Sequence, residues 1–184
     1  EVPGKMEIFT GEGMKEAKLS AYDSIVHYAK FLHTGLLSVE AKTGYMRAWV
    51  GGISSQYFKY DHVLSKRQPG STFKPLVYTA ALKKGISPCT FFANDSIVYQ
   101  DYNNWTPKNA DNEYGGFYSM KGALTHSINT ISVKILEETG IDNVISLAKK
   151  FGIKGELPKV PSLALGTGNV SLKEMVLAYS VFMN

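Results

Sequence analysis

The apolar residues of one segment near the N-terminus follow a period of two. Leu37, Val39 and Ala41 share one face of residues 35–41, and a similar alternation resumes after Lys42-Thr43-Gly44. Alternation of this kind predicts strands that are buried on one side. Gly44 suits the positive-φ position of a short hairpin loop. The pattern therefore predicts a β-hairpin over residues 35–52 with a three-residue turn.

Elsewhere the apolar residues recur at helical spacing. Gly85 and Gly140 stop two of the segments, and Ser171 with Glu174 forms a capping box that opens the last one. The predicted helices cover residues 24–32, 71–84, 119–139, 141–152 and 171–184. Residues 86–118 form a long loop rich in Asn, Asp and Tyr, and loops of this length are usually functional or disordered.

The composition suits one globular domain, or most of one, because 44% of the 184 residues are hydrophobic. The net charge is +4, but the lysines are scattered and the only arginines are Arg47 and Arg67, so no nucleic-acid partner is expected. Cys89 is the single cysteine, which excludes an internal disulfide. The four histidines lack the spacing of paired ligands, so we expect no metal site.

Both ends of the sequence suggest a piece of a longer protein. The chain begins at Glu1 rather than Met, and it ends at Asn184 directly after an apolar run. No segment approaches the ~20 apolar residues of a membrane span. A membrane anchor, if the parent protein has one, is therefore expected outside this sequence.

The segment RQPGSTFKP, residues 67–75, places Ser71 three residues before Lys74. In a helix these two side chains lie on one face and can touch. A lysine in a first turn faces the positive end of the macrodipole, which together with partial burial lowers its pKa and lets it act as a base toward the serine hydroxyl. The alternative from the residues alone is that Ser71 is an N-cap.

A second polar group occurs in HSINT, residues 126–130, where Ser127 and Asn129 interrupt an apolar helical stripe. Serine and asparagine inside a helix compete with its backbone hydrogen bonds. The pattern therefore predicts a turn between two helices with both side chains projecting. The alternative is that both residues are ordinary helix caps.

Together the motifs carry a resemblance. RQPGSTFKP, followed by SIN with Ser127 lying 56 residues after Ser71, resembles the S-x-x-K and S-x-N motifs in the transpeptidase domain of class A penicillin-binding proteins. AKTGYMRAWVGG, WTPKN and LALGTGNVSLKEMVLAYSVFMN resemble other segments of that domain. The resemblance covers residues 35–184 and implies that residues 1–34 are a linker from an absent upstream domain.

The fold that the resemblance implies is α+β, a penicillin-recognising serine transpeptidase (β-lactamase-like) fold. This chain would hold its helix-rich part and its N-terminal hairpin, without the C-terminal strands of the sheet. The family's K-T-G motif follows S-x-N, whereas Lys42-Thr43-Gly44 precedes Ser71 and is interpreted as turn chemistry. The third motif is thus expected beyond Asn184, and the truncated chain alone is expected to be inactive.

The implied activity of the parent protein is D,D-transpeptidation of peptidoglycan stem peptides through an acyl-serine intermediate. Ser71 would be the nucleophile, Lys74 its base and Ser127 the proton donor to the leaving amine. Asn129 would bind the donor amide, and Trp105 would stack on substrate, with packing of a buried loop as the alternative for Trp105. No cofactor is implied.

The implied partners are stem peptides, β-lactams and other cell-wall synthesis proteins. The implied location is the outer face of the bacterial cytoplasmic membrane, periplasmic or extracellular, with a membrane-anchored parent. Two other functions stay open: a β-lactam-hydrolysing or β-lactam-sensing relative, and a non-catalytic scaffold with the same fold.

Overall fold

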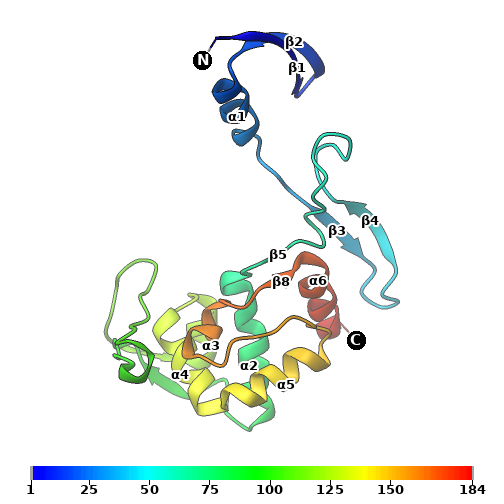
Figure 1. Ribbon diagram of the computed structural model, residues 1–184. Coiled ribbons are helices and arrows are strands. Elements are labelled where there is room, and N and C mark those ends of the chain that lie inside the picture. The colour runs from blue at the N-terminus through cyan, green and yellow to red at the C-terminus, as the bar shows by residue number, and fades with distance from the viewer. Residues whose placement is uncertain (1, 184) are drawn as a thin grey trace.

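The computed structural model describes residues 2–183. Figure 1 shows a helical body at one end and a small N-terminal part at the other, with a two-stranded hairpin between them. The helical body contains α2 to α6, and segments far apart in sequence meet there. Within the described range, no helix is long and apolar enough to cross a bilayer.

The N-terminal part was only partly predicted. β1 (Gly4–Thr10) pairs antiparallel with β2 (Gly13–Leu19), and the sequence pattern did not indicate this hairpin. α1 covers Ala21–Ala29 rather than 24–32, because Ser20 and Asp23 form a capping box ahead of the expected start. Ile25 and Leu32, two of the apolar residues at helical spacing in this segment, are 68% and 85% exposed.

Aromatic rings hold this N-terminal part to the segment that follows the second hairpin. Phe9 of β1 lies 5.7 Å from Phe58 and 5.6 Å from Phe31, measured between ring centroids. Tyr28 of α1 also contacts Phe58, at 6.1 Å. Aromatic pairs at these distances stabilise a contact beyond their area burial. β1 and α1 are therefore packed, through Phe9 and Tyr28, against Phe58.

The predicted hairpin at residues 35–52 is confirmed. β3 (Leu36–Val39) pairs antiparallel with β4 (Met46–Val50), with a register shift between Ser38 and Val39. The connection is longer than the three residues expected, since the strands stop at 39 and resume at 46. Gly44 has φ +74°, as the turn requires. Lys42, Thr43 and Gly44 all lie in this connection, as interpreted from the sequence.

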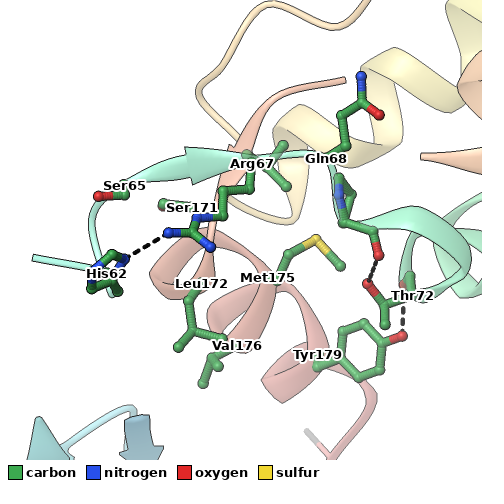
Figure 2. Close-up of a pocket in the computed structure, with 12 residues that line it drawn as sticks. His62, Ser65, Arg67, Gln68, Thr72, Ser171, Leu172, Met175, Val176 and Tyr179 are labelled. Carbon is green, nitrogen blue, oxygen red and sulfur yellow. Dashed lines mark hydrogen bonds between the residues drawn. The ribbon is translucent and has the colours of Figure 1, made fainter. Parts of the chain in front are cut away.

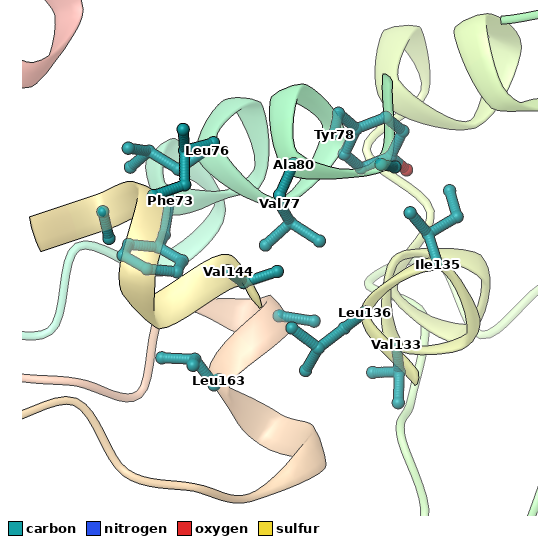
Figure 3. Packing of buried hydrophobic residues seen from close by; sticks show 14 of the residues in the cluster. Phe73, Leu76, Val77, Tyr78, Ala80, Val133, Ile135, Leu136, Val144 and Leu163 are labelled. Atoms are coloured by element: carbon teal, nitrogen blue, oxygen red, sulfur yellow. The ribbon is translucent and has the colours of Figure 1, made fainter. Parts of the chain in front are cut away.

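The core lies between α2 (Lys74–Lys83), α4 (Asn129–Thr139) and α5 (Ile141–Lys150). Leu76 and Val77 of α2 meet Leu136 of α4 and Val144 of α5, and all four side chains are fully buried. Figure 3 shows these side chains converging from three helices. Burial of each such side chain contributes about 1.5–3 kcal/mol, so α2 is anchored on its apolar face.

Short elements connect the helices and were not predicted. β5 (Lys66–Arg67) pairs with β8 (Val170–Ser171), and β6 (Phe91–Ala93) pairs with β7 (Phe117–Ser119). The β6–β7 pair closes the base of the long loop, which contains the 3₁₀ turn Gln100–Tyr102.

The remaining elements are α3 (Met120–Thr125), the 3₁₀ turn Pro161–Leu165, α6 (Leu172–Ser180) and the 3₁₀ turn Val181–Met183.

The mixed helix-and-strand architecture confirms the α+β prediction. The capping box of Ser171 and Glu174 opens α6 as predicted: the Ser171 hydroxyl accepts from Glu174 N, and the Glu174 carboxylate accepts from Ser171 N at 2.7 Å. α6 ends at Ser180 rather than continuing as one helix. The final residue of the predicted helix, Asn184, lies outside the described residues.

Candidate active site

Ser71 lies in a 3₁₀ turn, Gly70–Phe73, that precedes α2. The helix expected over residues 71–84 is confirmed over Lys74–Lys83, but its first turn, which carries Ser71, is 3₁₀ rather than α. Phe73 is the N-cap of α2 and Pro69 that of the turn, without a side-chain cap, so the capping interpretation of Ser71 is wrong. The Ser71 side chain is exposed, and nothing in its local backbone role requires a hydroxyl.

The turn that carries Ser71 is backed by the loop at residues 165–169. Gly166 has φ +73°, and a Cβ placed on it would lie 2.2 Å from the carbonyl oxygen of Gly70. No side chain fits at that distance, so a glycine is required for the two backbones to touch. This LGTGN segment therefore packs directly against the turn that carries Ser71.

The predicted break between two helices is confirmed. α3 ends at Thr125 and α4 begins at Asn129, with Ser127 between them at φ +53°. A left-handed conformation is uncommon for a residue with a Cβ, and it persists only where the surrounding contacts enforce it. The Ser127 side chain is exposed, whereas that of Ile128 is buried and pins the turn to the core.

The Lys74 amine joins the two motifs. Its Nζ donates to the Ser127 carbonyl oxygen at 2.6 Å, to Ser127 Oγ at 2.9 Å and to Asn129 Oδ1 at 2.7 Å. The sequence predicted contact with Ser71, but across the described part of the chain the hydrogen bonds of this amine go to Ser127 and Asn129. Position N1 of α2 aims the side chain across the core toward the turn between α3 and α4.

Burial shifts the Lys74 amine toward its neutral form. The residue is 1% exposed, and no ion pair among residues 2–183 includes it. Loss of water around the ammonium lowers the pKa of Lys74 to about 8. When neutral, the amine can accept from the Ser127 hydroxyl while it still donates to the other two oxygens. The same contacts therefore accommodate both protonation states.

A polar cavity of about 420 Å³ brings the motif residues together. Its lining includes Ser71, Ser127 and Asn129. Lys74 does not line it and lies buried behind Ser127 and Asn129. The sequence did not single out the other residues of the wall, which include Asn109, Asp111, Glu113, Tyr118 and His126.

Trp105 does not line this cavity and, unlike Lys74, forms no hydrogen bond to Ser127 or Asn129 within the described residues. Its ring lies 5.6 Å from that of Tyr99, and the two residues form an isolated β-bridge. The indole is partly buried against the edge of the core. This arrangement matches the alternative given for Trp105, an anchor within the long loop.

A second cavity lies beside the same turn (Figure 2). Thr72 lines it, whereas the neighbouring Ser71 lines the polar cavity. Met175 and Tyr179 of α6 form its opposite wall, and Tyr179 Oη donates to the Thr72 carbonyl oxygen at 2.7 Å. The hydrogen bond fixes the turn to α6 from this side, as Gly166 does from another.

The structure also places two buried asparagines next to the site, Asn94 and Asn109, which are 4% and 6% exposed. Both belong to the loop predicted as irregular, and periodicity gives no signal for their burial. In the sequence, Asn109 is only the last residue of the WTPKN segment and has no signal of its own. Among the described residues, no group of three or more His, Cys, Asp or Glu side chains is arranged to hold a metal ion.

The strain at Ser127 yields a stability prediction. Because a left-handed residue with a Cβ is disfavoured by about 1–2 kcal/mol, we expect Ser127→Gly to have a higher free energy of unfolding than Ser127→Ala, by about 1 kcal/mol. Urea denaturation of both variants measures the difference. Ser146, exposed within α5, is the control, since there alanine should be the more stable by about 1 kcal/mol. Equal stabilities at position 127 would contradict the strain argument.

The fold and the two motifs define a class of protein. The family model described as "Penicillin binding protein transpeptidase domain" matches residues 35–184, the range predicted from the sequence. The chain therefore belongs to the family of penicillin-binding protein transpeptidase domains.

Individual relatives agree with this assignment. The chain is 41% identical over 160 residues to penicillin-binding protein 1A of Neisseria gonorrhoeae and 40% identical over 156 residues to that of Pseudomonas aeruginosa. These matches cover 83% and 82% of the chain. The chain spans only about a fifth of the length of these relatives, 20% and 19%.

Solved structures show the same fold. Penicillin-binding protein 1A from Haemophilus influenzae superposes with a TM-score of 0.78 at 28% identity, covering 96% of this chain and 26% of that one. PonA1 from Mycobacterium tuberculosis, solved in complex with penicillin V, superposes with a TM-score of 0.72. The latter match covers 88% of this chain and 47% of that one at 21% identity, so it supports the fold alone.

Proposed function

We propose that the protein carrying this chain is a serine D,D-transpeptidase that cross-links peptidoglycan stem peptides. The observation that carries the proposal is the position of the Lys74 amine. It is buried, has a lowered pKa, and is hydrogen-bonded to Ser127 and Asn129 at the wall of a cavity that Ser71 also lines. Membership of the penicillin-binding transpeptidase family supports the same reaction.

In the proposed acylation step, Ser71 Oγ attacks the carbonyl carbon of the penultimate D-Ala of a donor stem peptide. The hydroxyl proton passes to the neutral Lys74 amine as the new C–O bond forms. Contacts between a catalytic base and its nucleophile often tighten only when substrate binds. The absence of a Ser71–Lys74 hydrogen bond within the described residues is therefore compatible with this step.

Collapse of the tetrahedral intermediate then breaks the peptide bond. Ser127 Oγ gives its proton to the departing D-Ala amine and is reprotonated by Lys74, whose Nζ lies 2.9 Å away. Deacylation runs in the reverse sense: an amine of a second stem peptide attacks the acyl-serine ester, loses a proton toward Lys74, and Ser71 regains its hydroxyl. Acyl transfer requires no redox step in either half-reaction.

Asn129 is proposed to bind the donor's backbone amide. Its Oδ1 accepts from Lys74, and one hydrogen of its Nδ2 goes to the Lys108 carbonyl oxygen at 2.7 Å. An amide nitrogen has two hydrogens, so one remains for a substrate carbonyl. Trp105 is left out of the proposed site because it packs against Tyr99 away from the cavity.

The proposal extends to partners and location. β-Lactams would act as donor mimics that leave an acyl-serine, and the other partners would be stem peptides and proteins of cell-wall synthesis. The protein would act at the outer face of the cytoplasmic membrane, held there by a segment outside this sequence. Residues 1–34 would connect the domain to an upstream one, consistent with a family match that starts at residue 35.

Labelled penicillin tests the proposal on the full-length protein. We expect one stable adduct per protein, mapped by mass spectrometry to the peptide that contains Ser71. Rapid release of hydrolysed penicillin would instead indicate a hydrolase, and Asp111 and Glu113 in the cavity wall would be the first carboxylates to examine as its base. No adduct at any concentration would favour the non-catalytic scaffold.

The lowered pKa of Lys74 also predicts the pH dependence of acylation. Only the neutral amine can take the Ser71 proton, and its fraction increases as the pH passes the pKa of about 8. We expect the second-order rate of penicillin acylation to rise about tenfold from pH 6 to 7 and to level off above pH 9. Stopped-flow measurement with a chromogenic β-lactam checks this, and a rate independent of pH between 6 and 9 would contradict the assignment of Lys74.

A further inference from the structure

The helix that carries Asn129 is capped by a residue from another part of the chain. α4 begins with N–H groups that have no intrahelical partner, and its N-cap, Ile128, has no side-chain oxygen to offer. Asn109 Oδ1 accepts from Asn129 N at 3.0 Å and from Thr130 N at 3.2 Å. Asn109, 20 residues upstream of Asn129, therefore caps the N-terminus of α4, a role that a local Ser or Asp usually has.

Asn109 is itself held in one orientation. Its Nδ2 donates to Asn94 Oδ1 and to the Glu113 carbonyl oxygen, both at 2.8 Å. Thr130 Oγ1 donates to Asn94 Oδ1 at 2.7 Å and closes the network back onto α4. Rotation of the Asn109 amide by half a turn would place donors against donors at one end and acceptors against acceptors at the other. The network thus determines which atom faces the start of α4.

The residue before Asn109 makes a second attachment to the same place. The Lys108 carbonyl oxygen accepts from Asn129 Nδ2 at 2.7 Å, while Asn129 Oδ1 accepts from Lys74. Two consecutive loop residues therefore hold the backbone and the side chain of Asn129. The side-chain amide of Asn129 is therefore held at both ends, by the Lys108 carbonyl oxygen and by the Lys74 amine.

The contacts of Lys108 and Asn109 lie next to a strained part of the backbone. Ser127, two residues before Asn129, holds φ +53°, and such a conformation needs surrounding contacts that enforce it. Lys74 binds the carbonyl oxygen and hydroxyl of Ser127 from inside. Asn109 accepts from the backbone N–H groups two and three residues further on, those of Asn129 and Thr130.

We propose that Asn109 is a positioning residue for the Ser127–Asn129 turn. Its amide sets the start of α4 so that Ser127 Oγ and Asn129 Oδ1 meet the Lys74 amine. Asn109 lines the cavity, but its polar atoms are engaged by the protein, so it acts through Asn129 rather than on substrate. This inference rests on the proposed function, because the effect of positioning is measured on acylation.

The test compares Asn109→Leu with Asn109→Asp in the full-length protein. Leucine keeps the size of the side chain but has no acceptor, whereas aspartate keeps an oxygen that can accept from Asn129 N and Thr130 N. A misplacement of about 1 Å at a catalytic group can lower a rate about 10²-fold. We expect Asn109→Leu to lower the acylation rate constant by about that factor with little change in the dissociation constant of the initial penicillin complex. Aspartate keeps the acceptor for α4, but its second oxygen faces the acceptors Asn94 Oδ1 and Glu113 O, so it should restore only part of the rate.

Asn143→Ala is the matched control. Asn143 Nδ2 donates to the Thr139 carbonyl oxygen at 2.8 Å, at the far end of the same helix. We expect this variant to have a lower unfolding midpoint and an unchanged acylation rate. A general loss of stability in α4 would thereby be separated from a loss of position at its start.

Amide hydrogen exchange gives a readout that does not depend on the reaction. In Asn109→Leu, the amides of Asn129 and Thr130 should exchange faster than in the unaltered protein, while those in the middle of α4 keep their protection. Unaltered exchange together with an unaltered acylation rate in Asn109→Leu would overturn the inference. Failure of the unaltered protein to acylate would instead overturn the proposed function, and exchange would still decide whether Asn109 sets the turn.

Discussion

Ser71→Ala is expected to abolish covalent labelling by penicillin in the full-length protein. We do not expect Ser127, the other serine that lines the cavity, to take its place, because its hydroxyl is hydrogen-bonded to the Lys74 amine at 2.9 Å. Ser71 is exposed and lies in a turn that has no side-chain cap. Its removal should therefore change the free energy of unfolding by no more than about 0.5 kcal/mol.

Mass spectrometry of the intact protein after incubation with penicillin measures the adduct, and thermal unfolding followed by circular dichroism checks the fold. Thr72→Ala is the control, since this neighbouring hydroxyl donates to the Pro69 carbonyl oxygen and faces the second cavity. That variant should still form the adduct. Labelling of Ser71→Ala to the same extent as the unaltered protein would contradict the assignment of the nucleophile.

The elements that the sequence predicted correctly have local signals. The hairpin at residues 35–52 follows from the alternation of apolar residues and from Gly44 in its turn. The capping box of α6 is formed by two residues, Ser171 and Glu174, that lie three positions apart. The break between α3 and α4 was also predictable, because Ser127 and Asn129 are poor residues for a helix interior. In each case the deciding contacts lie within one turn or one hairpin.

What the sequence did not predict depends on contacts between distant segments. The hydrogen-bond partners of Lys74 lie 53 and 55 residues away, so helical spacing indicated Ser71 but could not indicate Ser127 and Asn129. Asn109 is buried only because its amide meets the start of α4 and Asn94. Ile25 and Leu32 follow a helical pattern, yet the structure buries neither of them.

The turn that carries Ser71 combines a local sequence signal with contacts to distant segments. Pro-Gly before Ser71 indicates a chain reversal into a helix, and the structure has one, in the form of a 3₁₀ turn. Gly166 and Tyr179 then hold that turn from two sides, through a close backbone contact and a hydrogen bond to Thr72. Ser71 is thus exposed at its side chain but restrained in its backbone, the condition that pre-organised catalysis requires.

Lys74→Met should lower the rate of penicillin acylation by about 10²–10⁴-fold, the usual contribution of a positioned general base. Methionine matches the length of the lysine stem and carries no basic nitrogen. The small remaining rate should lose its rise around pH 8, since the group whose pKa is about 8 in the folded protein is gone. A stopped-flow pH profile measures both changes. Lys83→Met is the control, because Lys83 lies exposed in the last turn of the same helix and should leave the profile unaltered.

The same pair of variants separates the electrostatics of Lys74 from its role as a base. In the folded protein its pKa is about 8, below the ordinary value of 10.5, so between these values the unfolded chain binds more protons than the folded one. Stability contributed by this group is therefore lowest below pH 8 and rises toward pH 10.5, by about 3 kcal/mol in total. Urea denaturation at pH 7.5 and pH 10 should show this rise in the unaltered protein and in Lys83→Met, but not in Lys74→Met. A Lys74→Met variant with the same pH slope of stability and an undiminished acylation rate would show that the buried amine is neither the perturbed group nor the base.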